Sequence, residues 1–587
     1  MASKDYETAA AAWTAIVALA PDLPEARSNL GLTYHLQRKY ELAIEHFRAA
    51  LKQNPQLLSA KVFLGIDYYL TSRPDRAIEE LEGARTLSPE NAEARKWLAI
   101  SYIETSRFAN AITELQECRR LDPEDHELIF HLGRAYRKLS TQAFFTVRRA
   151  GLESPWLFLL RSRQFAQQGD TRKSLEELRH AARIDARVPG VHYRIAELLE
   201  EEGRLQQAAD AYNRELDNYP VHLRSAAGLI RTLRKLGMHQ DAEAIKQRAL
   251  RLHEESPGAV QALASAASQQ HGQTQLSAED TKRIRKSLPS FEAGGKRLLT
   301  ARVLDALLSG QPEKTLQLAP SLEAGGNADQ ARYWQARAYL ELGQPNQALE
   351  RLVLLQTRQP DNVEFAFYLQ RCAEELAIEL LELFASLEPE SYRTHQLRAE
   401  YHAAREEDER AIEEYTRALA LAPHAAQLHL AIGSLYMEQR KYEEALAAYQ
   451  EELMNDPYSV AALSRAGEVY LITGATDEAQ KVLVKATQIH PASATTHKTL
   501  GQVYLKKNKY AKSVEHLQSA LRLGMRDDET VYYHLGRAFR MLGNREEADK
   551  NFAIVRRLKE ANRTIVQERL ESAVEERSRD LPKPNPR

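Results

Sequence analysis

Small residues recur at intervals of 34 in the first part of the chain, and this period constrains the fold more than any other feature. Prolines keep the same interval. The repeating positions are Gly31, Gly65, Ala99 and Gly133, with Pro21, Pro55, Pro89 and Pro123. Between them, apolar residues have the 3.6-residue spacing of amphipathic helices. The period predicts a row of helical hairpins, in which each small residue lets two helices approach closely and each proline separates one hairpin from the next.

Two stretches carry the pattern of a known family most fully: LGLTY…A…F…P within residues 30–55, and LGQVY at 500–504. They resemble the tetratricopeptide repeat (TPR) family. The resemblance implies an all-α fold, a right-handed TPR superhelix (α-solenoid) of about sixteen helix-turn-helix repeats, with the first helix of each repeat lining a concave groove. The small position of the pattern can be followed through residues 31, 65, 99, 133, 162, 196, 230, 264, 302, 336, 370, 399, 433, 467, 501 and 536.

Two spacings in this series are 29 residues instead of 34, from 133 to 162 and from 370 to 399. In both places the turn between the two helices of the repeat is missing. We therefore expect a tight corner or a kink in the row at each of them.

The stretch EARKWLAISY (93–102) returns 237 positions later as QARYWQARAY (330–339). The same offset relates the two short spacings and the stretches YNREL and YQEEL, which predicts that a block of seven repeats was duplicated whole. The sequence accordingly divides into an N-terminal TPR array (1–257), a degenerate repeat or joint (258–297), a C-terminal TPR array (298–554), a capping helix (555–580) and a disordered tail (581–587). A basic cluster in the joint, Lys282, Arg283, Arg285 and Lys286, is either a site for an acidic partner or a solvated helix face.

The composition does not favour nucleic-acid or membrane binding. Lys plus Arg total 80 and Asp plus Glu total 82, a formal net charge of −2, and no apolar run is long enough to span a bilayer. The apolar stretch at 8–20 lies where an export signal would lie, but Asp5 and Glu7 precede it and it repeats the next 34 residues. We interpret it as a structural helix, which leaves a cytoplasmic location as the default. Cys118 and Cys372 have no disulfide or ligand spacing and are predicted to be buried thiols.

No catalytic, cofactor or metal motif is found in the sequence. The closest histidine pairs, His126 with His131 and His424 with His429, are five residues apart, which points each pair to different helix faces. The stretch AGGK (293–296) lacks the leading Gly and the following Ser or Thr of a phosphate loop. We therefore expect no enzymatic activity, no cofactor and no metal.

The TPR resemblance also indicates which side chains line the groove: those two residues before, one after and four after the small position. The residues predicted to bind a partner there are Asn29, Phe63, Trp97, His131, Arg134, Arg137, Trp334, Arg337, Tyr368 and Arg371. Aromatic and Arg side chains are the usual composition of a binding hot spot. Two alternatives stay open, since large aromatic residues also pack between repeats and Arg side chains also lie along solvated helices.

The His-Arg-Arg set of HLGRAYR recurs in HLGRAFR at His534, Arg537 and Arg540, and such side chains favour acidic segments. We predict a non-catalytic scaffold that binds proteins or peptides, with acidic segments as one class of partner. One alternative is a regulatory or substrate-recruiting subunit of a partner enzyme. The other is a transferase activity in residues 258–300.

Overall fold

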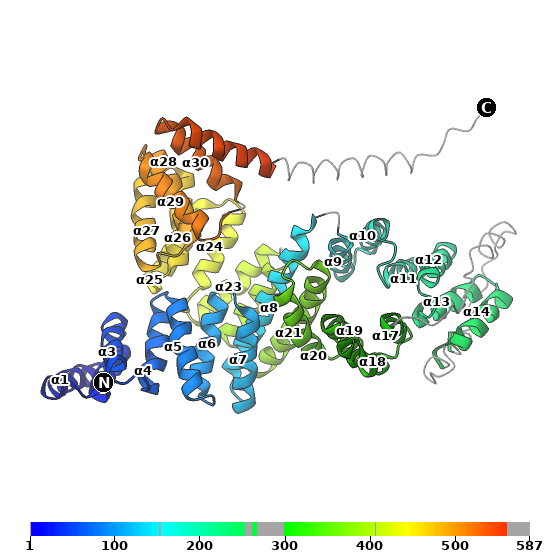
Figure 1. Ribbon diagram of the computed structural model, residues 1–587, viewed down its shortest axis with the longest axis horizontal. Helices are drawn as coiled ribbons and strands as arrows, with labels where there is room; N and C mark the ends of the chain where they lie inside the picture. Colours follow the sequence, from blue (N-terminus) through cyan, green and yellow to red (C-terminus); the bar gives the residue numbers. More distant parts are fainter. Residues whose placement is uncertain are drawn as a thin grey trace. The chain divides into compact units, whose positions relative to one another are not determined.

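The computed structural model describes residues 2–151, 154–252, 261–263, 265–266, 299–405, 407–526 and 528–559. Within these ranges the regular structure is helical and contains no strand, which confirms the predicted all-α fold. Two compact units are present (Figure 1): unit 1 comprises Met1–Lys138 with Ala377–Arg587, and unit 2 comprises Leu139–Leu376.

The helices of each unit follow one another as antiparallel pairs. Unit 1 contains α1 (Ala2–Leu19), α2 (Pro24–Leu36), α3 (Tyr40–Gln53), α4 (Leu58–Leu70), α5 (Pro74–Leu87), α6 (Ala92–Glu104), α7 (Phe108–Leu121), α22 (Tyr392–Ala403), α23 (Asp408–Leu421), α24 (Leu428–Glu438), α25 (Tyr442–Asn455), α26 (Val460–Thr473), α27 (Thr476–Ile489), α28 (Ala494–Lys506), α29 (Tyr510–Arg522), α30 (Glu529–Met541) and a helix over residues 545–559. Unit 2 contains α9 (Pro155–Gln167), α10 (Thr171–Ile184), α11 (Val191–Glu201), α12 (Leu205–Asn218), α13 (Leu223–Lys235), α14 (His239–Leu252), α17 (Leu299–Leu308), α18 (Pro312–Ala324), α19 (Ala328–Glu341) and α20 (Pro345–Arg358). Two longer helices, α8 (His126–Arg149) and α21 (Val363–Leu387), run from one unit into the other.

Fifteen of the sixteen predicted small positions fall inside described helices, and position 264 lies outside the described residues. The division into arrays at 257 and 298 stays a prediction. Apart from residues 261–263 and 265–266, the predicted joint with its basic cluster lies outside the described residues, as do the disordered tail and residues 560–580 of the capping helix. Residues 555–559 form the end of the last described helix.

Close packing inside each hairpin explains the small residue of the pattern. In α4, a Cβ added to Gly65 would lie 2.5 Å from Cγ of Leu81 in α5, a side chain that is fully buried. Gly31 faces Phe47 in the same way, sixteen residues later in the chain. Because no larger side chain fits between these helices, the predicted reason for the 34-residue period is confirmed.

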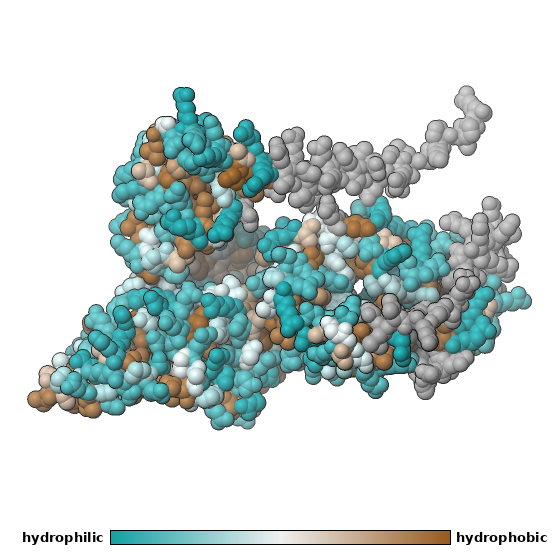
Figure 2. Space-filling model, in the orientation of Figure 1, coloured by the Kyte–Doolittle hydropathy of each residue, from teal (hydrophilic) through white to brown (hydrophobic). Residues whose placement is uncertain are grey.

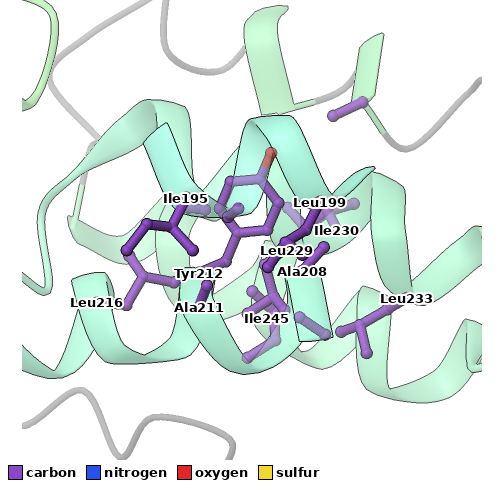
Figure 3. Packing of buried hydrophobic residues seen from close by; sticks show 14 of the residues in the cluster. Ile195, Leu199, Ala208, Ala211, Tyr212, Leu216, Leu229, Ile230, Leu233 and Ile245 are labelled. Carbon is purple, nitrogen blue, oxygen red and sulfur yellow. The ribbon is translucent and has the colours of Figure 1, made fainter. Parts of the chain in front are cut away.

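Unit 2 has a continuous core of the same kind. Figure 3 shows Tyr212 of α12 among apolar side chains of α11 and α13, including Leu199 and Leu229. The Tyr212 ring is fully buried, and its hydroxyl donates to Glu200 Oε2 at 3.0 Å. The core is therefore built from contacts between neighbouring hairpins, as expected for an array in which one hairpin cannot bury its own apolar face.

The YNREL and YQEEL stretches have a structural role that the sequence pattern did not reveal. Glu215 of the first stretch is buried, and its carboxylate accepts hydrogen bonds from the backbone N–H groups of Gly190 (2.7 Å) and His192 (3.1 Å) at the start of α11. Glu452 accepts from the N–H of Gln427 (2.7 Å) before α24. Each glutamate thus caps the first helix of its own hairpin from the second helix, because the first N–H groups of a helix have no intrahelical partner.

Successive first helices touch one another in both units, as α2 does with α4, α4 with α6, and α11 with α13. Contacts between successive second helices are less extensive throughout the described ranges. A row whose first helices are closer together than its second helices curves toward the first helices. This places the first helices on the inner side of the curve within each unit, as the TPR resemblance implied.

The tight corner expected at the two short spacings is wrong, and the kink expected as its alternative stays a prediction. The chain continues there as single helices, α8 with 24 residues and α21 with 25. With the turn deleted, the residues on both sides retain a helical pattern, so continuing one helix satisfies every backbone hydrogen bond across the join.

The long helices complete hairpins by exchanging their halves. In unit 1, a Cβ on Gly133 of α8 would lie 3.5 Å from Leu380 Cβ of α21, and the rings of Phe130 and Phe384 are 5.9 Å apart. In unit 2, Gln370 of α21 donates to the hydroxyl of Ser140 in α8 at 3.4 Å. The first half of one long helix therefore pairs with the second half of the other. In an ordinary repeat, the second helix of the hairpin would follow a turn and pack in that place.

None of the helices in the described ranges is long and apolar enough to cross a bilayer. Apolar residues on the face drawn in Figure 2 form small separate patches, one of which covers α1, where Leu19 is 86% exposed. The helix predicted over 8–20 is present up to Leu19 as part of α1, and Cys118 and Cys372 are buried, as predicted.

Candidate protein-interaction surfaces

The predicted groove residues of the N-terminal repeats lie on three successive first helices. Asn29 is on α2, Phe63 on α4 and Trp97 on α6, and all three are half-buried. The Phe63 ring is 5.2 Å from His35, centroid to centroid. Because α2, α4 and α6 are neighbours on the inner side of the row, we group these three residues, with Tyr69 of α4, as the N-terminal strip.

Trp97 is the largest member of this strip. Its indole ring is 5.4 Å from the ring of Tyr69, and its Nε1–H donates to Glu93 Oε1 at 2.7 Å, one turn earlier in the same helix. Tyr69 belongs to the strip but was not among the predicted residues, although it stands four residues after the small position Gly65, a register that the TPR resemblance assigns to the groove. The indole therefore keeps an exposed side and a hydrogen bond that a partner group can replace.

Charges beside the strip are balanced. Lys96 Nζ lies 3.2 Å from Glu93 and 3.3 Å from Glu127, and Arg393 lies 2.6 Å from Glu127. Burial alone lowers the pKa of Lys96, but the carboxylates of Glu93 and Glu127 raise it overall, so the ammonium stays charged at neutral pH. Both cations beside the strip are thus paired with carboxylates of the chain.

Trp334 occupies the corresponding place in the duplicated block, yet its surroundings differ. It is buried in α19, and its ring is 4.9 Å from that of Tyr333. Arg337 lies over the ring of Tyr368, with Cζ 4.5 Å from the centroid, and donates to the Tyr333 hydroxyl at 2.9 Å. These side chains form a packed aromatic and Arg cluster inside unit 2, which favours the packing alternative for Trp334.

Tyr368 joins this cluster to the next first helix, because its ring lies 5.7 Å from that of Trp156 in α9. Arg371, also predicted for the groove, is half-buried on α21 and takes no part in any of the ion pairs or ring contacts found among the described residues. Its neighbour Glu374 instead lies 3.5 Å from Arg163 of α9.

The predicted residues of α8 lie against another part of unit 1. Arg134 Nε donates to Glu400 Oε1 of α22 at 3.0 Å, and Arg137 lies over the Tyr401 ring, 5.3 Å from its centroid. His131 is buried, and burial followed by the nearby Arg134 lowers its pKa to about 3. The structure thus shows what HLGRAYR binds within the chain: a helix with a carboxylate and an aromatic ring on adjacent residues.

Glu400 and Tyr401 were missed from the sequence. The signal was available, since Glu400 stands one residue after the small position 399, the same register as Arg134 after 133. Opposite charges at the same register of two first helices indicate a contact only if the two helices are neighbours. Because 266 residues separate Arg134 from Glu400, the sequence offered no reason to place their helices side by side.

Across the described ranges, no group of three or more His, Cys, Asp or Glu residues is arranged to hold a metal ion.

Several solved structures resemble the chain at low similarity. A MamA crystal structure is 20% identical over 30% of this chain and 96% of its own, with a TM-score of 0.27. MamA 41-end from Desulfovibrio magneticus RS-1 is 20% identical over 29% and 96%, with the same TM-score of 0.27. A chain in the structure of Naa15/Naa10 bound to HypK-THB is 18% identical over 94% and 97%, with a TM-score of 0.29.

No curated protein sequence matches the chain. Four family models do, each described as tetratricopeptide repeat. They match residues 24–57, 69–135, 330–362, and, for one model, 159–222, 430–494 and 498–549. Together the matched segments make up more than half of the sequence, and they coincide with the helical hairpins described above. The chain belongs to the tetratricopeptide repeat family.

Proposed function

We propose that the protein is a scaffold that binds a protein partner on the N-terminal strip, with Trp97 as the central contact. Membership of the TPR family supports a protein-interaction role, and proteins of this family are generally non-catalytic. The observation that carries the proposal is the state of Trp97: a large aromatic side chain on the inner side of the row that is only half-buried, with its ring 5.4 Å from that of Tyr69 and its Nε1–H donated to Glu93. Trp and Tyr are enriched in binding hot spots because they bury a large area with little loss of side-chain entropy.

The other predicted residues support the proposal less. His131, Arg134 and Arg137 are engaged by α22, and Trp334 and Arg337 are packed inside unit 2. A partner would have to displace these contacts, whereas at Trp97 it replaces solvent and one hydrogen bond.

Replacement of Trp97 by Ala tests the proposal. We expect the variant to lose at least tenfold in partner affinity, the equivalent of about 1.4 kcal/mol, while its thermal midpoint changes little. The partner is first captured from native extract with the unmodified chain and then measured against each variant by calorimetry. Leu42→Ala, an exposed apolar residue on the second helix α3, is the matched control and should bind normally.

Trp334→Ala separates a binding role from a packing role. Because Trp334 is 9% exposed, its truncation should lower the stability of unit 2 by about 3 kcal/mol or more without weakening binding per folded molecule. If Trp97→Ala behaves like Trp334→Ala, with a collapsed midpoint and intact binding, the N-terminal strip is core and the proposal is wrong. Assay of the captured complex for activity distinguishes a simple scaffold from a subunit of a partner enzyme.

A further inference from the structure

The face that α22 covers on α8 occurs a second time in unit 1, on α30. Residues 130–137 read FHLGRAYR and residues 533–540 read YHLGRAFR. The local geometry is also repeated. Arg134 lies over the ring of Phe130, 5.6 Å from its centroid, and Arg537 lies over the ring of Tyr533 at 5.9 Å. The two helices therefore present the same chemical surface.

The two copies differ in what lies on them. On α8, Glu400 pairs with Arg134 and Tyr401 lies against Arg137, so α22 neutralises and covers the cations. On α30, Arg537 and Arg540 are exposed, and no carboxylate of the described residues lies within ion-pair distance of either. We refer to Tyr533, His534, Arg537 and Arg540 as the α30 face.

Further features of the α30 face fit the binding of a helix that carries a carboxylate, as α22 does on α8. Tyr533 is 46% exposed, which is high for an aromatic residue next to a hairpin core. His534 Nδ1 is buried without a hydrogen-bond partner, as is Nδ1 of His131 on α8. Burial followed by Arg537 and Lys498 lowers the pKa of His534 to about 4, so the ring is neutral and the two guanidinium groups supply the charge.

Arg540 contacts a ring of the helix over residues 545–559. Its Cζ lies 4.7 Å from the centroid of Phe552, and this cation–π contact restricts the side chain although it remains exposed. A preordered Arg loses less side-chain entropy on binding a carboxylate. The face thus combines positive charge, an exposed ring and restricted side chains.

We propose that the α30 face binds an α-helix of another protein that carries a carboxylate followed directly by an aromatic residue, in the manner in which α22 covers α8. The carboxylate accepts from Arg537 as Glu400 does from Arg134, and the aromatic ring lies under Arg540 as Tyr401 lies under Arg137. The inference deepens the proposed scaffold function and rests on it, but it concerns a surface separate from the N-terminal strip.

The probe is a fluorescein-labelled peptide with the sequence of residues 388–405, held helical by a side-chain staple on the face away from Glu400 and Tyr401. The staple is needed because helices of this length are marginally stable in water. Binding to the full chain is followed by fluorescence anisotropy at two salt concentrations. We expect saturable binding that weakens at higher salt, since the contact is charge-assisted and partly exposed.

Charge reversal provides the decisive comparison. The double variant Arg537→Glu, Arg540→Glu should bind the peptide at least tenfold more weakly, and a peptide with Glu400→Lys should fail on the unmodified chain and regain binding on the double variant. Arg522→Glu, on the neighbouring second helix α29, makes the same charge change as Arg537→Glu alone; it is the control for that single variant and should bind normally. Arg537→Gln, which keeps the stem of the side chain, should give an intermediate loss if folding is preserved.

Absence of peptide binding to the unmodified chain, or binding that Arg537→Glu and Arg540→Glu leave unchanged, would overturn the proposal. These outcomes are distinguishable from failure of the proposed function, which is read from Trp97→Ala and the captured partner. If the chain binds its partner through Trp97 but does not bind the peptide, the proposed scaffold function stands and the proposed role of the α30 face is wrong.

Discussion

Removal of the Arg134 guanidinium should destabilise unit 1 by about 3 kcal/mol. Arg134 and Glu400 are 3.0 Å apart, with side chains only 12% and 14% exposed, so Arg134→Ala leaves a mostly buried carboxylate without its cation. The estimate lies at the lower end of the 3–5 kcal/mol range for broken buried pairs, because Gln396 also donates to Glu400 at 3.2 Å. Glu400→Ala should cost a similar amount for the converse reason.

A double-mutant cycle isolates the contact between the two helices. With both side chains removed, no unpaired charge is left, so the double variant should be less destabilised than the sum of the single variants by about 1–3 kcal/mol. Arg163 and Glu374 in unit 2 form the matched control pair. They are 3.5 Å apart and about one third exposed, and their coupling should stay within about 1 kcal/mol.

Global unfolding is a poor measure here, because long repeat arrays lose cooperativity. Hydrogen exchange of peptides from α8 and α22 reports local stability directly, and urea titration followed by circular dichroism checks the whole chain. In Arg134→Ala, protection should fall in both α8 and α22, although 266 residues separate the two side chains. Additive single variants, or loss of protection confined to α8, would refute the contact between α8 and α22.

Two further predictions concern packing and pH. Gly65→Ala should lower the free energy of unfolding by about 1–2 kcal/mol, since overpacking against buried Leu81 outweighs the gain in helix propensity. Gly83→Ala is the control, because its Cβ would meet only the flexible end of Lys61 at 3.3 Å. In the same urea titration it should raise the free energy of unfolding by about 0.5–1 kcal/mol. Buried His131 has a folded-state pKa of about 3 against an ordinary value of 6.5, so the unfolded chain binds the proton first and stability falls as pH drops below 6.5. His131→Gln should therefore lose about 2 kcal/mol less than the unmodified chain between pH 7 and pH 5, and an unchanged pH dependence would contradict a buried neutral ring.

The comparison of Trp97 with Trp334 shows why the candidate site was only partly predictable. Both stand in the same sequence context, and both were predicted for the groove. The exposure of a side chain depends on the residues around it. Trp334 has Tyr333 as a neighbour, whereas Lys96 occupies the corresponding position beside Trp97. Duplication copies the position of a side chain but not the residues that later surround it.

Local sequence by itself determined the hairpins of this protein. Gly31 and Gly65 mark where two helices must touch, and the partner residue follows sixteen positions later, so both sides of the contact lie within one period. Only the tertiary structure decided what happens where the turn is missing. A continuous helix and a corner are compatible with the same local pattern around Gly133, and the choice depends on Leu380, 247 residues away, which fills the space that a returning helix would have filled. Contacts this distant in sequence have no period to reveal them, because they are selected by the burial of apolar faces after the hairpins have formed.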